Sequence, residues 1–258
     1  MIKPVLLATI TALLISAAPP APVTIRHANN LFTVDNIGNI YLVDGGELLK
    51  YLPAGKFVAR YSNLKLGDIT SVDATNPLKI IVYYRDFQQL VFLDNQLSAN
   101  APLSLEKLGY EQAHLVCAGA NNGFWVYNKQ NNELLRFNET AKLAISTGNL
   151  KQVLGADVNP DFMVEHNGFL FLNDPASGIY VFDIFGAFSK VISIKDLSTF
   201  EPGSEIIYYR RDSLLCSYKH RLFEESCKTL PVPSARSVRY LNGKIYLAFG
   251  DSLVCDEF

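Results

Sequence analysis

The chain has 258 residues, of which 49% are apolar and 12% are aromatic, so it can bury a large core and differs in composition from disordered proteins. Its 23 basic and 25 acidic residues leave a formal net charge of −2. Because no basic stripe runs along the sequence, the charge pattern argues against a nucleic-acid partner.

The first 18 residues have the features of an export signal. Lys3 supplies a positive charge, 5–15 is an apolar run, and Ser16-Ala17-Ala18 provides small residues at a cleavage point. A helix over that run would span about 16 Å, roughly half of a bilayer core, which disfavours a membrane anchor. We therefore expect a signal peptide over 1–18.

The rest of the chain is expected to form one domain outside the cytoplasm. Residues 22–258 contain no segment of membrane-spanning length and no low-complexity linker. No cysteine precedes Cys117, so a lipid anchor on an N-terminal cysteine is excluded. The sequence thus predicts a periplasmic or secreted protein with no transmembrane span.

Six times along this domain, a short strand runs through a tight turn into a second strand of apolar and aromatic residues. The clearest copies are 162–172 and 238–247. A hairpin repeated every 40–45 residues or so is typical of a β-propeller. The predicted strands are 31–35, 39–43, 47–52 and 56–62 in blade one; 69–73, 79–84, 88–93 and a long segment reaching 107 in blade two; 114–118, 124–128, 133–137 and 143–147 in blade three; 162–165, 169–173, 178–182 and 190–194 in blade four; 205–209, 213–218, 221–225 and a weak strand at 228–230 in blade five; and 237–241, 244–249 and 252–256 in blade six.

Turn residues support these boundaries. Asn122-Gly123, Asn167-Gly168 and Asn242-Gly243 lie between predicted first and second strands, and Asn and Gly tolerate the positive φ angles of a type I′ turn. Gly45-Gly46 and Gly250-Asp251 are placed in the same way between second and third strands.

The last predicted blade lacks one strand. The segment 23–27 is a strand without a blade of its own, and it follows the expected signal peptide. We expect it to complete blade six, because this pairing closes the ring and removes an exposed strand edge. The predicted fold is therefore all-β: a six-bladed β-propeller closed by the N-terminal strand, with neighbouring chain ends.

The repeat resembles six-bladed propellers of the NHL and related periplasmic-repeat type. The matching residues are Gly38-Asn39-Ile40-Tyr41-Leu42-Val43-Asp44 and Tyr180-Val181-Phe182-Asp183. The segments 123–127 and 133–137 are also similar to uncharacterised exported propellers of Bacteroidota. These resemblances imply the fold and carry no activity with them.

The sequence offers no convincing catalytic residue. Gly250-Asp251-Ser252-Leu253 spells the nucleophile block of GDSL-type esterases, but those enzymes carry it near the N-terminus with a catalytic histidine downstream, and no histidine follows it here. The motif is better explained as a hairpin turn, and no Gly-x-Ser-x-Gly elbow occurs. We therefore assign no catalytic residue.

Metal and cofactor sites are not indicated either. The four histidines, His27, His114, His166 and His220, are not at metal-ligand spacing. The predicted ends of the six first strands do not form an acidic ring; they are Asp35, Asp73, Gly119, Glu165, Arg210 and Leu241. Their carboxylates are expected to accept backbone hydrogen bonds at turns. No metal or cofactor is predicted, although scattered channel carboxylates leave open a metal-dependent, lactonase-like hydrolase as the alternative function.

The four cysteines, Cys117, Cys216, Cys227 and Cys255, allow three full pairings. Cys216 and Cys227 flank a hairpin, but a turn at Lys219-His220 would set Cys216 opposite Phe223, so buried free thiols are favoured over this bridge. No pair has CxxC spacing, which disfavours a zinc site.

Binding is therefore the favoured function, and the loops suggest where. In a propeller, the loops between strands two and three and between strands four and one open on the same face. On this chain those loops are predicted to gather Tyr84, Arg85, Phe87, Tyr110, His114, Lys129, His220, Arg221 and Arg236. Arg, Tyr and Phe often anchor interfaces, so we expect a non-enzymatic module for an envelope protein, peptide or glycan. A second cluster, 208–211, is assigned to the opposite face, and Asn138-Glu139-Thr140 to a turn.

Overall fold

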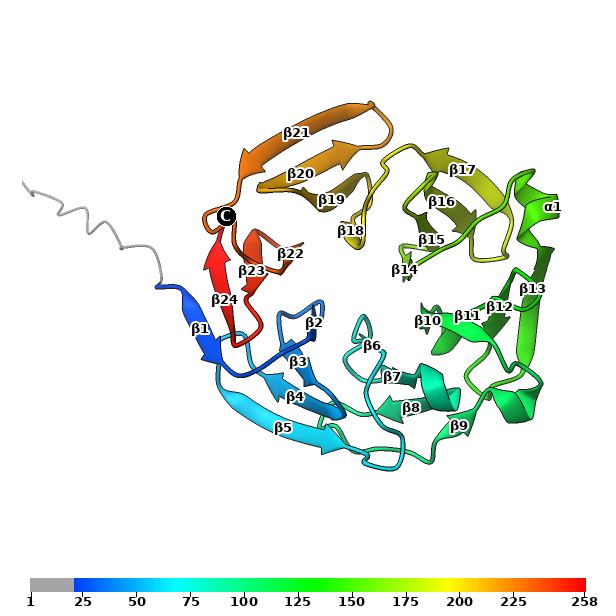
Figure 1. Ribbon diagram of the computed structural model, residues 1–258, viewed down its shortest axis with the longest axis horizontal. Coiled ribbons are helices and arrows are strands. Elements are labelled where there is room, and N and C mark those ends of the chain that lie inside the picture. Colours follow the sequence, from blue (N-terminus) through cyan, green and yellow to red (C-terminus); the bar gives the residue numbers. More distant parts are fainter. Residues whose placement is uncertain (1–20) are drawn as a thin grey trace, which may run out of the picture.

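The computed structural model describes residues 21–258, which form six four-stranded antiparallel sheets around a central axis (Figure 1). The predicted six-bladed β-propeller is confirmed. The expected signal peptide lies outside the described residues. The blades, each given from its inner to its outer strand, are β2 (Leu31–Val34), β3 (Ile40–Asp44), β4 (Glu47–Tyr51) and β5 (Phe57–Ser62); β6 (Ser71–Asp73), β7 (Ile80–Tyr84), β8 (Gln89–Leu93) and β9 (Leu103–Ser104); β10 (Ala113–Gly119), β11 (Gly123–Asn128), β12 (Glu133–Phe137) and β13 (Leu143–Asn149); β14 (Phe162–His166), β15 (Phe169–Asp174), β16 (Gly178–Asp183) and β17 (Phe188–Ile192); β18 (Phe200–Pro202), β19 (Ile206–Arg211), β20 (Leu214–Lys219) and β21 (Glu224–Thr229); and β22 (Ser237–Leu241), β23 (Lys244–Ala248), β24 (Ser252–Glu257) and β1 (Val23–Arg26).

Helices are short and lie in connections. They are η1 (Arg85–Phe87), η2 (Glu106–Leu108) and α1 (Leu150–Leu154). None of the helices within 21–258 has the length and apolar character needed to cross a membrane.

The ring closes as predicted. Strand β1 pairs antiparallel with β24, so that Val23 lies opposite Cys255 and Ile25 lies opposite Leu253 (Figure 1). The side chain of Ile25 is buried in a cluster that joins blade six to blade one. Strand β1 therefore completes blade six, and the two ends of the propeller are neighbours.

The core lies between blades, in six apolar clusters that each join two neighbouring sheets. All five residues of β7 are buried, because this strand packs on both of its faces. Trp125, Phe124 and Phe137 of blade three are among the largest fully buried side chains. Continuous apolar runs in the sequence therefore mark second and third strands, which are covered by blades on both sides.

Two of the three predicted Asn-Gly turns have the expected geometry. The φ angles are 48° and 78° at Asn167-Gly168, and 51° and 79° at Asn242-Gly243. In blade three the turn lies one residue earlier, at Asn121-Asn122, with φ angles of 57° and 58°. Gly123 instead begins β11, where an added Cβ would meet the carbonyl oxygen of Phe137 at 2.4 Å. Close backbone approach thus explains this glycine.

A second turn recurs where third strands end. In three blades, a side chain at the end of the third strand or just after it accepts hydrogen bonds from the backbone N–H groups two and four positions later; these residues are Asp94, Asn138 and Asp183. Such Asx turns stabilise the chain reversal into the outer strand. The interpretation of Asn138-Glu139-Thr140 as a turn is confirmed.

Blade five differs from the prediction by one strand. Its inner strand is β18, Phe200–Pro202, and the segment predicted as the first strand is the second, β19. Strand β18 was missed because it has three residues, ends in proline and is followed by no Asn-Gly pair. The β19–β20 and β20–β21 loops of this blade therefore lie on the faces opposite to the predicted ones.

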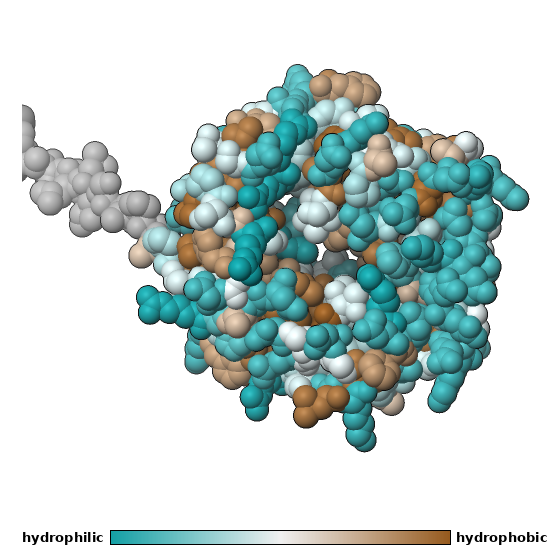
Figure 2. Space-filling model, viewed as in Figure 1, coloured by the Kyte–Doolittle hydropathy of each residue, from teal (hydrophilic) through white to brown (hydrophobic). Residues whose placement is uncertain are grey.

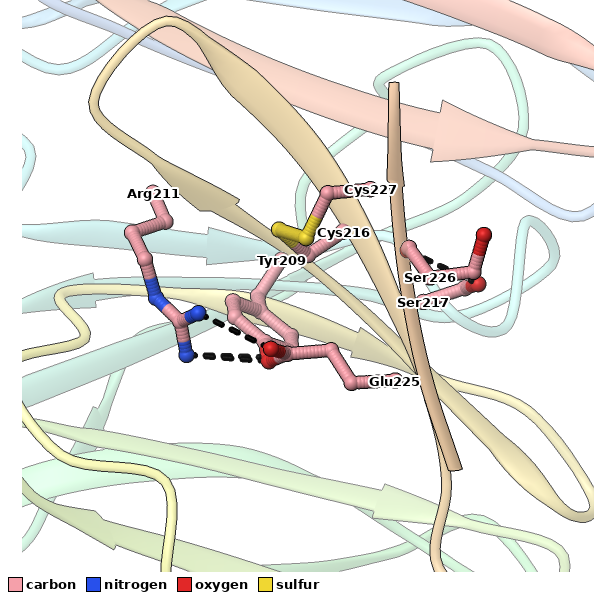
Figure 3. The surroundings of a disulfide bond; sticks show 7 residues. All are labelled: Tyr209, Arg211, Cys216, Ser217, Glu225, Ser226 and Cys227. Atoms are coloured by element: carbon pink, nitrogen blue, oxygen red, sulfur yellow. Dashed lines mark hydrogen bonds and ion pairs between the residues drawn. A yellow bond between two sulfur atoms is a disulfide. The ribbon is translucent and has the colours of Figure 1, made fainter. Parts of the chain in front are cut away.

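The length of the next turn corrects the expectation for two of the cysteines. The β20–β21 turn contains the four residues 220–223, so Lys219 pairs with Glu224 and Cys216 lies directly opposite Cys227. These two cysteines form a disulfide (Figure 3). The expectation of free thiols at 216 and 227 is wrong, whereas Cys117 and Cys255 are free and buried as expected.

Candidate functional site

A cavity of about 330 Å³ occupies the central channel and is lined by the first strand of every blade. Figure 2 shows the opening at the centre of the ring. The lining at one end comes from residues at or next to the start of each first strand. They are polar and carry amide, hydroxyl, imidazole or carboxyl groups: Asn30, Ser71, His114, Asp161, Thr199 and Ser237. We call the face on which they lie the top face; it also carries the loops between second and third strands.

Arg85 and His114 form the best-defined part of this mouth. The Arg85 Nε donates to the carbonyl oxygen of His114 at 3.1 Å, and the Arg85 backbone N–H donates to Thr70 Oγ1 at 3.0 Å. Within the described residues, the Nη groups of Arg85 have no hydrogen-bond partner. They can therefore donate to a ligand at the mouth.

His114 is held in its neutral form at neutral pH. Burial lowers the pKa of His114, and the positive charges of Arg85 and Lys129 lower it further. Its ring packs edge-on against Tyr127, with 6.4 Å between ring centroids. A neutral imidazole offers one donor and one acceptor to a polar ligand.

An ion pair lies deeper in the channel. Arg239 Nη1 donates to Glu201 Oε1 at 2.5 Å, and the guanidinium lies over the ring of Phe32 at 5.9 Å. Burial raises the pKa of Glu201, while the charge of Arg239 opposes this rise. The pair neutralises two charges in a confined channel.

The first-strand carboxylates bind backbone amides, as expected. Asp35 accepts the N–H groups of residues 37 and 39. Asp73 accepts the N–H of Ala118, and Glu165 accepts the N–H of Ala120 together with the indole of Trp125. The last two acceptors connect neighbouring blades. Asp73 therefore connects blade two to blade three, and Glu165 connects blade four to blade three.

In the described part of the chain, one cluster brings three potential metal ligands within 4.8 Å of one another: Cys216, Glu225 and Cys227. Its two sulfur atoms are bonded to each other. Glu225 accepts from Arg211 Nη2 at 2.9 Å and from the hydroxyl of Tyr209 (Figure 3). The donor set is already used by the disulfide and the ion pair, so it does not fit a metal.

The predicted binding residues divide into three groups. Arg85, Phe87, His114, Lys129 and Arg236 lie on the top face or its loops, with 49% of Phe87 exposed. Tyr110 also lies there, but it packs edge-on against Phe137, at 5.4 Å between ring centroids.

Tyr84 is fully buried, and its hydroxyl donates to that of Tyr61 at 3.4 Å. Its assignment to a binding surface is wrong, because it ends a second strand that is covered on both sides.

His220 and Arg221 lie on the opposite face, which we call the bottom face. They belong to the loop between the third and fourth strands of blade five, whereas the prediction placed them between the second and third. The 208–211 cluster, which was predicted on the opposite face, ends at a top-face loop. Arg210 donates to the carbonyl oxygen of Ala235 and lines a top-face cavity with Arg236. Both corrections follow from the unrecognised strand β18.

Sequence reasoning missed the polar residues of the channel mouth. Only the ends of the first strands were compared in the sequence, so Asp161 and Thr199 at the mouth and Glu201 and Arg239 deeper in the channel were not considered. Aligning the predicted strands would not have found the first three, because Asp161 precedes its predicted strand and Thr199 and Glu201 belong to the unrecognised strand β18 or adjoin it.

Comparison with known proteins supports the fold alone. No protein-family model matches the chain, and no curated protein matches it. A streptogramin B lyase structure matches with a TM-score of 0.59 and 14% identity, over 87% of this chain and 77% of the lyase. The extracellular domain of the putative one-component system BT4673 from B. thetaiotaomicron matches with a TM-score of 0.57 and 11% identity, over 88% of this chain and 32% of that one. BBS1N, in complex with ARL6DN, matches with a TM-score of 0.55 and 11% identity, over 88% of this chain and 76% of that one.

Proposed function

We propose that the protein is an exported, non-catalytic β-propeller that binds a protein, peptide or glycan of the cell envelope at its top face. The observation that carries the proposal is the channel mouth. Six first strands place polar groups around one opening, and the Nη donors of Arg85 face no partner among the described residues. This is the arrangement of a recognition site, in which a few polar groups orient a ligand over a preformed hollow.

The ligand should itself be rich in hydrogen-bonding groups. The mouth offers hydroxyl, amide, carboxyl and guanidinium groups, and Phe87 adds an exposed apolar contact beside Arg85. Peptide backbones and sugars carry donors and acceptors that match this set. Arg beside an exposed aromatic side chain is also a frequent combination at interface hot spots.

The alternative, a metal-dependent hydrolase of the channel, has less support from the geometry. A cation site needs several carboxylates that converge on one point. Asp73 and Glu165 are instead used by amides of neighbouring blades, and Glu201 is paired with Arg239. The likeness to a lyase is one of fold and carries no activity to this chain.

Binding is tested with the double variant Arg85→Ala/Phe87→Ala, immobilised and exposed to an envelope extract. The matched control is Leu78→Ala/Lys142→Ala, which removes an exposed apolar and an exposed basic side chain from bottom-face loops. We expect the top-face variant to capture its partner at least about tenfold less well, since hot-spot residues each contribute 1–2 kcal/mol or more. Equal capture by both variants and the parent protein would refute the assigned face.

Export and the metal alternative are tested separately. Mass spectrometry of protein recovered from a periplasmic fraction should show a chain that begins near residue 18; a full-length chain in the cytoplasm would contradict export. Elemental analysis of the processed protein distinguishes the two functions. A stoichiometric divalent ion would favour the hydrolase and overturn the binding assignment.

A further inference from the structure

A second cavity, of about 360 Å³, lies on the bottom face between blades four and five. Its wall is made by Phe169, Phe171 and Val181 of β15 and β16. Phe171 and Val181 are almost fully buried, so this apolar wall is part of the cluster between the two blades. At the rim, Asn167 Nδ2 donates to Ser204 Oγ at 2.9 Å and connects the turns of both blades.

The polar side of this cavity is basic. Lys190 Nζ lies 2.9 Å from Nδ1 of His220, and no carboxylate of the described chain is within ion-pair distance of this ammonium. Arg221 also lines the cavity, and its Nη1 is paired with Glu205 at 2.8 Å. His166 completes the set from blade four. The half-buried ammonium of Lys190 therefore faces an imidazole and has no carboxylate partner in the described chain, so an anion bound beside it would be favoured.

The titration behaviour of these groups agrees with a positive potential. Burial lowers the pKa of Lys190, and the charge of Arg221 lowers it further. Burial also lowers the pKa of His220, and the charges of Lys190 and Arg221 lower it further, while a hydrogen bond with the Ser204 backbone and the charge of Glu205 oppose this. Burial lowers the pKa of His166. Both imidazoles are thus neutral at neutral pH, and a bound anion would relieve the repulsion between the cations.

We propose that this cavity binds a small organic anion, with its carboxylate against Lys190 and His220 and its apolar body against Phe169, Phe171 and Val181. The site lies on the face opposite to the channel mouth and does not depend on the function proposed above. Either can fail without the other.

The shape of the cavity favours this class over a simple inorganic anion. Volumes of about 300–1,000 Å³ are typical of small-molecule pockets, in which apolar walls supply affinity and a few polar groups supply orientation. A phosphate or sulfate ion would use the cations but leave the aromatic wall uncovered. A flat aromatic body would cover Phe169, of which 43% is exposed, and gain stacking or edge contacts.

The probe we suggest is naphthoate, compared with neutral naphthamide and with inorganic phosphate, measured by calorimetry at pH 7 and low salt. We expect naphthoate to bind at least about tenfold more tightly than either comparison ligand. Lys190→Gln should weaken naphthoate binding about tenfold or more, and Lys190→Arg should retain much of it. The matched control is Lys219→Gln, because Lys219 lies next to His220 at the end of β20 but pairs with Glu224 and does not line the cavity.

A second readout follows the imidazole itself. NMR titration should show that the pKa of His220 is higher when naphthoate is bound, because the anion offsets the positive charges of Lys190 and Arg221. Glu205 acts on His220 with and without the ligand, so it does not account for the change. Three results would overturn the proposal: no saturable binding of naphthoate, equal binding of naphthoate and naphthamide, or equal losses in Lys190→Gln and Lys219→Gln. A His220 pKa that does not move on binding would place the ligand elsewhere and would overturn it as well.

Discussion

Removing the disulfide of blade five should measurably weaken the fold. The change with the least structural disturbance is Cys227→Ser, because Cys227 is exposed on the outer strand β21, while Cys216 is fully buried and stays in the cluster between blades four and five. The variant breaks the bridge without opening a cavity. Its effect therefore reports on the cross-link itself.

The magnitude follows from the loop that the bond closes. Cys216 and Cys227 are 11 residues apart in the sequence. In the chain-entropy description, closing a loop of this length removes about 9 cal/mol/K from the unfolded state, which stabilises the fold by about 2.8 kcal/mol at 25 °C. For a domain of this size, such a loss lowers the melting temperature by roughly 6–11 °C.

The assay is denaturant unfolding of protein folded under oxidising conditions, followed by intrinsic fluorescence. Cys227→Ser should unfold with about 2.8 kcal/mol less stability than the parent protein, and a reductant should lower the parent to the same value. The same reductant should leave Cys227→Ser unchanged, because Cys117 and Cys255 are already free thiols. A loss under about 0.5 kcal/mol, or equal sensitivity of both proteins to the reductant, would refute the reasoning.

Three further predictions concern ring closure, contacts between blades and pH. Ile25→Ala should destabilise the protein by about 2–5 kcal/mol in thermal unfolding, because the side chain is buried where the ring closes, while the exposed neighbour change Thr24→Ala should cost far less; similar losses would contradict the closure. Glu165→Ala leaves two donors without a partner and should cost about 2–5 kcal/mol by chemical denaturation, against less than about 0.5 kcal/mol for the exposed turn residue Glu139→Ala. Burial holds the pKa of His166 in the folded protein below its unfolded value of about 6.5, so the unfolded chain takes up the proton first. Stability is therefore lost as the pH falls below about 6.5, by at most about 1.4 kcal/mol per pH unit. His166→Gln should make the stability depend less on pH between about 5.5 and 7.5, and an unchanged slope would disprove the prediction.

Local sequence determined most of the strands and several turns. Apolar and aromatic runs mark strands that are covered on both sides, and Asn-Gly pairs such as Asn167-Gly168 mark turns whose backbone needs positive φ. Both signals act within a few residues, so they can be read without knowing the fold. The missing strand of blade six likewise predicted ring closure by the N-terminal strand, which the pairing of Val23 with Cys255 confirms.

Only the tertiary structure decided which residues meet at the candidate sites. The first strand of blade five has weak local signals, and missing it exchanged the faces of His220 and Arg210. The length of the β20–β21 turn, which sets Cys216 opposite Cys227, was likewise not evident from the local sequence. The mouth of the channel and the Glu201–Arg239 pair bring together different blades. Such contacts depend on the order and orientation of whole sheets around the axis, which burial between blades sets and which no single stretch of sequence contains.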